Sequence, residues 1–158
     1  MGDTILLAVA LQRYGDITPR AIAVRDVASD MAEFYNAALA VLTVHVQLAL
    51  MPEEEDTGQK IERFLVPLID RGLRVESIVR EGSPRELISE VAKELDARIV
   101  VMGTHSKRGI LDTVVGGTAK AVIASAPCRV LLVAPTADED QKTRELITPE
   151  YPFIFPYG

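Results

Sequence analysis

The sequence predicts an α/β domain in three layers, with a five-stranded parallel sheet and helices on both of its faces. Short, continuous apolar runs, which are typical of strands buried on both faces, alternate along the chain with segments of helical periodicity. The 158 residues fit one domain. Because no repeat or second-domain linker interrupts this pattern, we assign the domain to residues 1–135 and the remaining residues 136–158 to a linker and tail.

The first strand is predicted at the apolar run Ile5–Ala10. Thr18 and Pro19 then predict a helix start, because Thr caps helix N-termini and Pro suits the first helical position. The helix is expected over Arg20–Ala38. The β-branched run Val41–Leu48 predicts the second strand.

A second helix is predicted from Gln59, where apolar residues recur at i, i+3, i+4, i+7 and i+8: Ile61, Phe64, Leu65, Leu68 and Ile69. Pro67 lies within it and is expected to kink or shorten it. Gly72 marks its C-terminal end. Leu73–Arg80 is the third predicted strand.

The second half of the chain continues the alternation. Ser83 and Glu86, separated by a proline at the first helical position, predict a third helix that starts with a capping box. The apolar run Ala97–Met102 predicts the fourth strand. A helix over Thr118–Ser125 and a fifth strand over Cys128–Val133 complete the pattern.

Composition and charge narrow the range of partners. The formal net charge of −6 argues against general nucleic-acid binding, which needs a basic surface. No apolar run approaches the length of a membrane span, and the N-terminus lacks the pattern of a signal peptide. One cysteine, Cys128, excludes an intrachain disulfide. We therefore expect a cytoplasmic protein without a membrane or nucleic-acid partner.

The loop after the fourth strand carries the strongest binding signal. Residues 103–118 run from the carboxyl end of a strand to a helix N-terminus and contain several glycines. Such a site favours an anion, because the first N–H groups of a helix are unpaired and its dipole is positive there. Lys107 and Arg108 add positive charge to this loop. Neither a Walker motif nor a dinucleotide fingerprint is present. The alternative to an anion site is that the glycines only shape a turn and a helix start.

Other candidate groups have simpler interpretations. His45 is expected in the core, and His105 in the loop is expected to have a backbone or exposed role. Two histidines and one cysteine give no adequate zinc ligand set. Cys128 is expected to be a buried structural thiol. We assign no catalytic residue and no metal site.

Taken in order, several segments of residues 4–134 resemble the universal stress protein family: Ile5–Val9, Leu42–Val46, Glu81–Pro84, Ile99–His105, Val115–Ala119 and Ala126–Val133. The resemblance implies the strand order 3-2-1-4-5. It also implies a homodimer formed by antiparallel pairing of strand 129–133, which would cover an apolar sheet edge.

The ATP-binding branch of that family carries the pattern Gly-x2-Gly-x9-Gly-Ser/Thr. Gly103 and Gly116 match its first and third glycines, but Ser106 stands at the second glycine. Gly117 stands at the Ser/Thr position, with Thr118 one residue later. The pattern is therefore degenerate.

Ala10 stands where the family's nucleotide-binding members have an acidic residue. The resemblance implies a stress-response regulatory module that binds ATP or another adenine nucleotide at the ends of strands one and four, with Mg²⁺ only if a triphosphate binds. The implied site residues are Ala8, Ala10, Val46, Met102, Gly103, Ser106, Gly116, Gly117 and Thr118.

Two alternatives stay open. In the first, the chain is a dimeric interaction module with a degenerate pocket that binds no nucleotide and has an unidentified regulatory protein as its partner. In the second, which we rank lowest, it is a weak hydrolase that uses His105. Four aromatic residues lie within residues 151–157, beyond the polar linker Thr136–Arg144. We expect this tail to dock on the domain or on the partner subunit, since clustered aromatic residues rarely stay exposed without a role. A disordered tail that binds another protein is the alternative.

Overall fold

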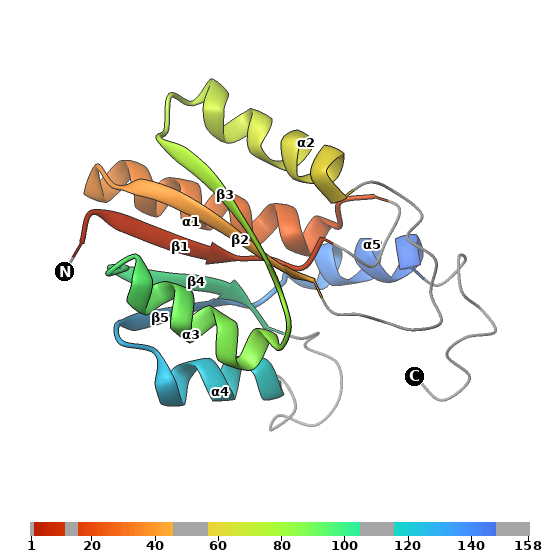
Figure 1. Cartoon of the computed structure of the whole chain (residues 1–158). Helices are drawn as coiled ribbons and strands as arrows, with labels where there is room; N and C mark the ends of the chain where they lie inside the picture. Colours follow the sequence, from red (N-terminus) through yellow and green to blue (C-terminus); the bar gives the residue numbers. More distant parts are fainter. Residues whose placement is uncertain (1, 12–15, 46–56, 105–115, 148–158) are drawn as a thin grey trace.

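The computed structural model describes residues 2–11, 16–45, 57–104 and 116–147. In chain order the elements are β1 (Thr4–Ala8), α1 (Pro19–Tyr35), β2 (Ala38–His45), α2 (Thr57–Asp70), β3 (Val75–Glu81), α3 (Pro84–Glu94), β4 (Ile99–Gly103), α4 (Gly117–Ser125), β5 (Arg129–Val133) and α5 (Ala137–Ile147). All strand pairs are parallel and follow the order β3-β2-β1-β4-β5 (Figure 1). The predicted fold class and strand order are confirmed.

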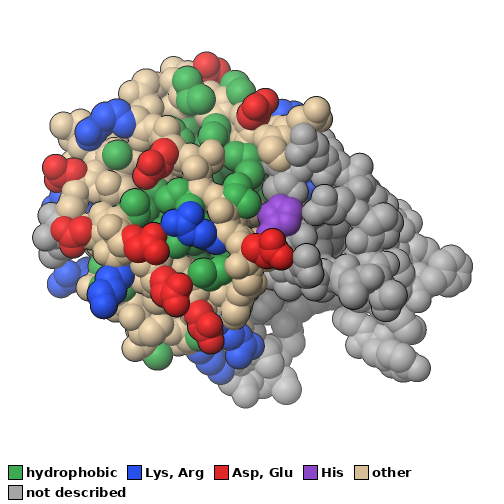
Figure 2. Space-filling model, in the orientation of Figure 1, with side chains coloured by type: hydrophobic (Ala, Val, Ile, Leu, Met, Phe, Trp, Pro, Cys, Tyr) green, Lys and Arg blue, Asp and Glu red, His purple; other side chains and the backbone are tan. Residues whose placement is uncertain are grey.

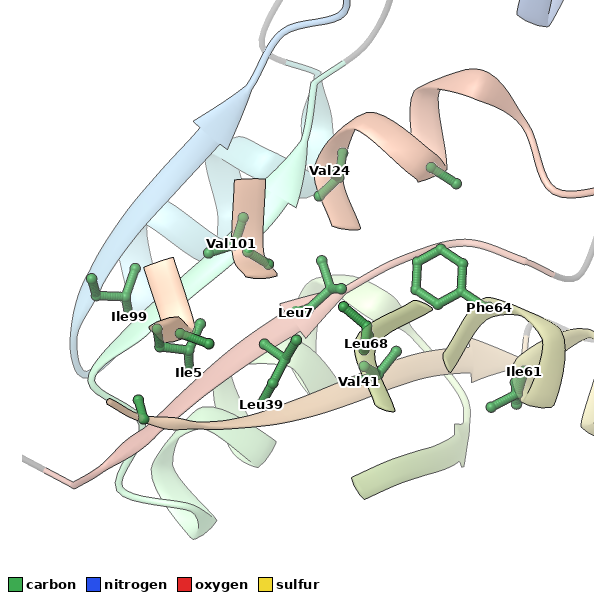
Figure 3. Close-up of a cluster of buried hydrophobic side chains, with 14 of the residues drawn as sticks. Ile5, Leu7, Val24, Leu39, Val41, Ile61, Phe64, Leu68, Ile99 and Val101 are labelled. Atoms are coloured by element: carbon green, nitrogen blue, oxygen red, sulfur yellow. The ribbon is translucent and has the colours of Figure 1, made fainter. Parts of the chain in front are cut away.

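Two hydrophobic clusters lie on opposite faces of the sheet. Side chains such as Leu7 and Val101 pack with α1 and α2 (Figure 3), whereas Leu6 and Val100 pack with α3 and α4. Successive side chains of a strand point to opposite faces. Burial of both faces therefore explains why the central strands are continuous apolar runs.

The boundary between α1 and β2 differs from the prediction. Helix α1 ends at Tyr35, and Asn36 takes the left-handed conformation at φ 51°. The N–H of Ala37 donates to the carbonyl of Ala32 at 2.9 Å, as in a helix C-terminal motif. Strand β2 consequently begins at Ala38, where the sequence predicted helix, and is described to His45.

Helix α2 continues through its internal proline. It includes Pro67 and extends to Asp70, so the proline neither ends the helix nor shortens it at that point. Gly72 has φ of 80°, and its N–H donates to the Ile69 carbonyl at 2.9 Å. The predicted glycine at the C-terminal end is therefore confirmed.

The predicted capping box of α3 does not form. Ser83 is the N-cap of the helix, but its side chain accepts no capping hydrogen bond. The N–H of Glu86 donates instead to the backbone carbonyl of Ser83 at 3.2 Å. Because this backbone bond satisfies the N–H that a capping box would use, the Ser83 hydroxyl is not needed there.

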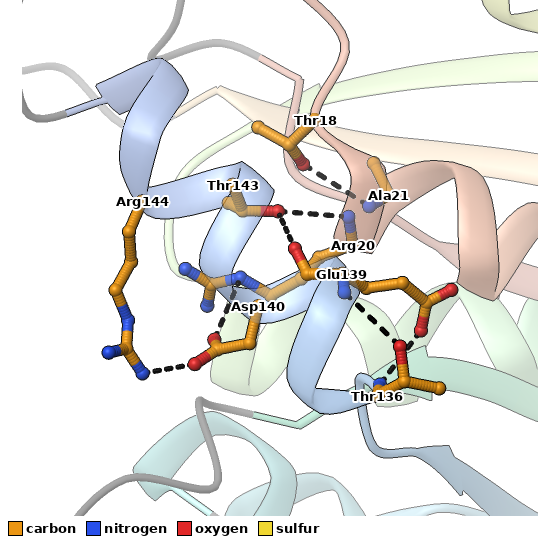
Figure 4. Close-up of polar contacts among 8 residues, drawn as sticks. All are labelled: Thr18, Arg20, Ala21, Thr136, Glu139, Asp140, Thr143 and Arg144. Atoms are coloured by element: carbon orange, nitrogen blue, oxygen red, sulfur yellow. Dashed lines mark hydrogen bonds and ion pairs between the residues drawn. The ribbon is translucent and has the colours of Figure 1, made fainter.

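The segment expected to be a linker is a helix. Thr136 and Glu139 form a reciprocal capping box at the start of α5, with bonds of 3.1 Å and 2.8 Å. The helix lies against α1 (Figure 4). The linker prediction for residues 136–144 was wrong because the segment is polar and its attachment to the domain uses polar contacts. The aromatic tail 151–157 lies outside the described residues.

Candidate functional site

The carboxyl ends of β1 and β4 lie side by side. Ala8 and Met102 are partners in the sheet register and are 9% and 6% exposed. The N–H of Val9 donates to the carbonyl of Leu42 at 3.0 Å, which extends the ladder to β2. The two predicted residues Ala8 and Met102 thus form the floor of this edge of the sheet, where ligands of open parallel sheets bind.

Gly103, the last residue of β4, has a packing role. A Cβ at this position would lie 3.1 Å from Cγ2 of Val24 in α1 and 3.9 Å from the carbonyl oxygen of Val133. The N–H of Thr104 donates to that same carbonyl at 3.1 Å. The glycine therefore lets α1 approach the end of the sheet closely, in addition to any ligand role.

Helix α4 begins at the same edge of the sheet (Figure 1). Its N-cap, Gly116, has φ of 73° and ψ of 161°, a conformation that is essentially restricted to glycine. The cap supplies no side-chain hydrogen bond, and the first turn contains no acidic residue. The N–H groups of Gly117, Thr118 and Ala119 therefore start the helix without intrahelical acceptors, and they favour an anion.

Arg85, in the first turn of α3, lies against this helix start. A Cβ at Gly117 would lie 3.1 Å from Cζ of Arg85 and would collide with the end of its guanidinium. The side chain is exposed. Arg85 could not be recognised from the sequence, because only the packing of α3 beside α4 brings it to Gly117.

The other predicted site residues either lie at the surface of this edge or fall outside the described residues. Ala10 is exposed in the segment after β1, so this part of the edge carries a methyl group and no carboxylate. Thr118 is half-buried in the first turn of α4. Val46 and Ser106 lie outside the described residues, as do His105, Lys107 and Arg108 of the predicted loop.

Two polar residues near the carboxyl edge, His45 and Lys60, differ in burial from what the sequence indicates. His45, expected in the core, is half-buried at the end of β2, where its register partner is Glu81. Lys60, in the first turns of α2, is 2% exposed, and its ammonium donates to the carbonyl of Leu11 at 2.8 Å. Sequence reasoning missed Lys60 because a lysine near a helix start is normally solvated.

The described residues offer little for metal or thiol chemistry. They contain no group of three or more His, Cys, Asp or Glu that could hold a metal ion. Cys128 is half-buried, and desolvation by burial raises the pKa of its thiol. The thiol thus stays protonated at neutral pH and is a poor nucleophile. It is less buried than the sequence predicted.

The charge of the surface and the hydropathy of the helices bear on possible nucleic-acid and membrane partners. Acidic and basic side chains are interspersed over the face seen in Figure 2, in keeping with the net charge of −6. Within the described ranges, no helix combines the length and the apolar character needed to cross a membrane.

The sequence profile of the universal stress protein family matches residues 4–134. The universal stress protein E homolog of Haemophilus influenzae is 42% identical over 62 residues, which cover 39% of this chain and 20% of that protein. A universal stress protein of Methanocaldococcus jannaschii is 30% identical over 79 residues, or 50% and 49% of the two chains. The match therefore spans about a fifth and about half of these relatives.

Solved structures share the fold. A universal stress protein from Archaeoglobus fulgidus superposes with a TM-score of 0.66 at 20% identity, covering 81% of this chain and 96% of that one. A universal stress protein in complex with cAMP gives a TM-score of 0.60 at 20% identity, with coverages of 83% and 95%. An Archaeoglobus fulgidus protein in complex with dAMP gives 0.58 at 21% identity, with coverages of 81% and 94%.

Proposed function

Because the chain belongs to the universal stress protein family, we propose that it is a cytoplasmic stress-response regulatory module that binds an adenine nucleotide at the carboxyl ends of β1 and β4. The base and ribose lie over Met102, and the phosphate lies at the start of α4. Val46, the other residue expected to flank the base, is outside the described residues. Two proteins of the same fold were solved in complex with cAMP and dAMP, which supports an adenine nucleotide as the ligand.

The start of α4 is the observation that carries this proposal. Gly116 has a positive φ and no side chain, so the N-cap offers no side-chain acceptor to the backbone N–H groups of the first turn. A phosphate fits such a site, because it accepts several N–H hydrogen bonds and its charge complements the helix dipole. Gly103 ends its strand at the same edge (Figure 1).

The departures from the ATP pattern favour a nucleotide other than a tightly held ATP. Ala10 offers no carboxylate to a metal-bound triphosphate, and Gly117 offers no hydroxyl. The loss of one charged or bidentate contact costs about 1–3 kcal/mol, or roughly one to two orders of magnitude in affinity. We therefore place AMP-like ligands ahead of ATP, with Mg²⁺ involved only when a triphosphate binds.

Isothermal titration of the full chain with ATP, ADP, AMP and cyclic AMP tests the proposal. We expect at least one ligand to bind with a dissociation constant below about 1 mM, a binding free energy of about −4 kcal/mol. Affinities weaker than that for all four ligands contradict it. Mass spectrometry of the purified protein adds a direct observation, because a co-purifying adenine nucleotide identifies the ligand.

The second candidate function, a dimeric interaction module, is favoured by the edge strand β5. In the described sheet β5 pairs with β4 alone, and its residues Val130–Val133 are half-buried rather than covered. Apolar edge strands are usually paired or protected. We propose a homodimer through residues 129–133 that then presents its surface to a regulatory protein.

Sedimentation equilibrium tests the dimer and the role of the tail. A chain that ends at Ile147 keeps all of α5 and removes residues 148–158. If the tail docks on the partner subunit, this truncation weakens the dimer. If dimerisation and the unfolding temperature both stay unchanged, the docking role of the tail is rejected.

A further inference from the structure

We propose that Arg85 recognises the phosphate of the bound nucleotide and takes over the role of the hydroxyl that the family's ATP motif carries at position 117. This inference rests on the proposed nucleotide site and assigns its phosphate specificity to a residue outside the family motif. Arg85 lies in the first turn of α3, about thirty residues before the glycines of α4.

The guanidinium of Arg85 occupies the space that a side chain at position 117 would take. A Cβ at Gly117 would lie 3.1 Å from Cζ and 3.7 Å from Nε of Arg85, and it would collide with a terminal nitrogen of the guanidinium. Side chains do not tolerate such approaches without movement. A serine or threonine at position 117 therefore requires the guanidinium of Arg85, which is the exposed end of a flexible side chain, to leave its observed position. We call this replacement of the hydroxyl by the guanidinium the steric exchange.

The electrostatic surroundings of the guanidinium also favour a bound phosphate. The guanidinium stands beside the positive end of the α4 dipole, where a cation is unfavourable in the absence of an anion. In the part of the chain that the structure describes, no carboxylate forms an ion pair with Arg85, its neighbour Glu86 included. The α4 N-cap supplies no side chain and the first turn no acid. A bound phosphate satisfies both groups at once.

The chemistry of the guanidinium defines the preferred ligand. Arg presents paired N–H donors that match two oxygens of one phosphate and keeps its charge at all physiological pH values, whereas a hydroxyl gives one neutral hydrogen bond. A terminal phosphate with two negative charges gains most from this exchange. The site is therefore expected to favour AMP strongly over adenosine, which lacks the phosphate.

The first test compares AMP with adenosine on the full chain by isothermal titration. Arg85→Met removes the charge and keeps much of the side-chain volume. We expect it to weaken AMP binding by about ten- to a hundredfold, the effect of one charge-assisted hydrogen bond, and to leave adenosine binding unchanged. Arg85→Lys should recover part of the loss. Lys93→Met, at the opposite end of α3, removes the same charge from an exposed position and should change neither affinity.

The second test exploits the steric exchange. Gly117→Ser in the wild-type background should weaken AMP binding, because the new side chain displaces the guanidinium. In the Arg85→Met background the same serine has room and supplies a hydroxyl, so it should strengthen AMP binding. This reversal of sign is not expected if Arg85 only stabilises the fold, and thermal unfolding of each variant verifies that the folded state persists.

The outcomes separate the two proposals. If the wild type binds adenosine and AMP but Arg85→Met leaves the ratio of their affinities unchanged, the role of Arg85 is wrong and the nucleotide site stands. If Gly117→Ser has the same effect in both backgrounds, the steric exchange is wrong. If the wild type binds neither ligand nor any of the other adenine nucleotides, both proposals fail.

Discussion

The backbone N–H of Arg20 donates to Oγ1 of Thr143 at 3.2 Å, across 123 residues of sequence. The bond joins the first turn of α1 to the middle of α5 (Figure 4). Pro19 has no N–H, and the N–H of Ala21 donates to the Thr18 hydroxyl at 3.2 Å. All the donors of the first three residues of α1 are thus accounted for within the protein, which leaves no anion site there, in contrast to the start of α4.

Thr143→Val should lower the free energy of unfolding by about 1–3 kcal/mol, since it leaves the half-buried Arg20 N–H without its acceptor. Thr143 is 1% exposed, and valine has nearly the same shape, so lost packing contributes little. Urea unfolding measures the change. Thr143→Ser keeps the hydroxyl and is the matched control; if serine and valine destabilise equally, the hydrogen bond is not the cause.

Asp140 should couple energetically to Arg20 and Arg144. Its side chain is 8% exposed, its Oδ1 lies 3.7 Å from Nε of Arg20, and its Oδ2 pairs with Arg144. Asp140→Asn should cost about 1–3 kcal/mol of unfolding free energy, because breaking a largely buried pair leaves cations less compensated. The cost should fall when Arg20→Met is added, which a double-mutant cycle in urea measures.

Asp138→Asn is the matched control for Asp140. Asp138 forms an ion pair with Lys142 at 3.0 Å on the same helix, but its side chain is 73% exposed. Exposed pairs contribute little, typically 0–1 kcal/mol. Equal losses for both substitutions would show that burial of the Asp140 pair carries no extra energy.

The sequence predicted the sheet well because burial on both faces of the central strands leaves a continuous apolar signal. Helix α5 carries no such signal. Its polar contacts with α1 are made by Thr143 and Asp140, which hydrophobic periodicity does not detect. A local signal was present in Thr136 and Glu139, which have capping-box spacing and form the box. Ser83 and Glu86 have the same spacing and do not form it. Spacing alone therefore does not distinguish the two cases.

The candidate site was predictable only in part, for a related reason. Gly103, Gly116 and Gly117 follow from motif spacing along the chain. Arg85 becomes part of the same edge only through the packing of α3 beside α4, a tertiary relationship without a pattern in the sequence. Residues that replace a motif side chain from another element are therefore found in the structure and not in the motif.

Gly116→Ala should destabilise the start of α4. With φ of 73° and ψ of 161°, the position is in a region that costs other residues about 1–3 kcal/mol. We expect a fall of that size in the free energy of unfolding, together with weaker AMP binding as the first N–H groups shift. Lys120→Ala, an exposed change in the same helix, should stay within about 0.5 kcal/mol. A fully stable Gly116→Ala variant would contradict the assigned backbone conformation.

Cys128 should react slowly with alkylating reagents while the protein is folded. Burial raises the pKa of its thiol, with a smaller contribution in the same direction from Asp96. The fraction of thiolate at a given pH is therefore lower in the folded than in the unfolded chain. The raised pKa also makes the stability of the fold depend on pH. The free energy that this thiol contributes to folding is fully present below its unfolded pKa and is lost as the pH rises through the higher folded pKa. Iodoacetamide labelling at pH 8, followed by mass spectrometry, should be slower in buffer than in guanidinium chloride. Equal rates under the two conditions would show that neither burial nor the raised pKa protects the thiol.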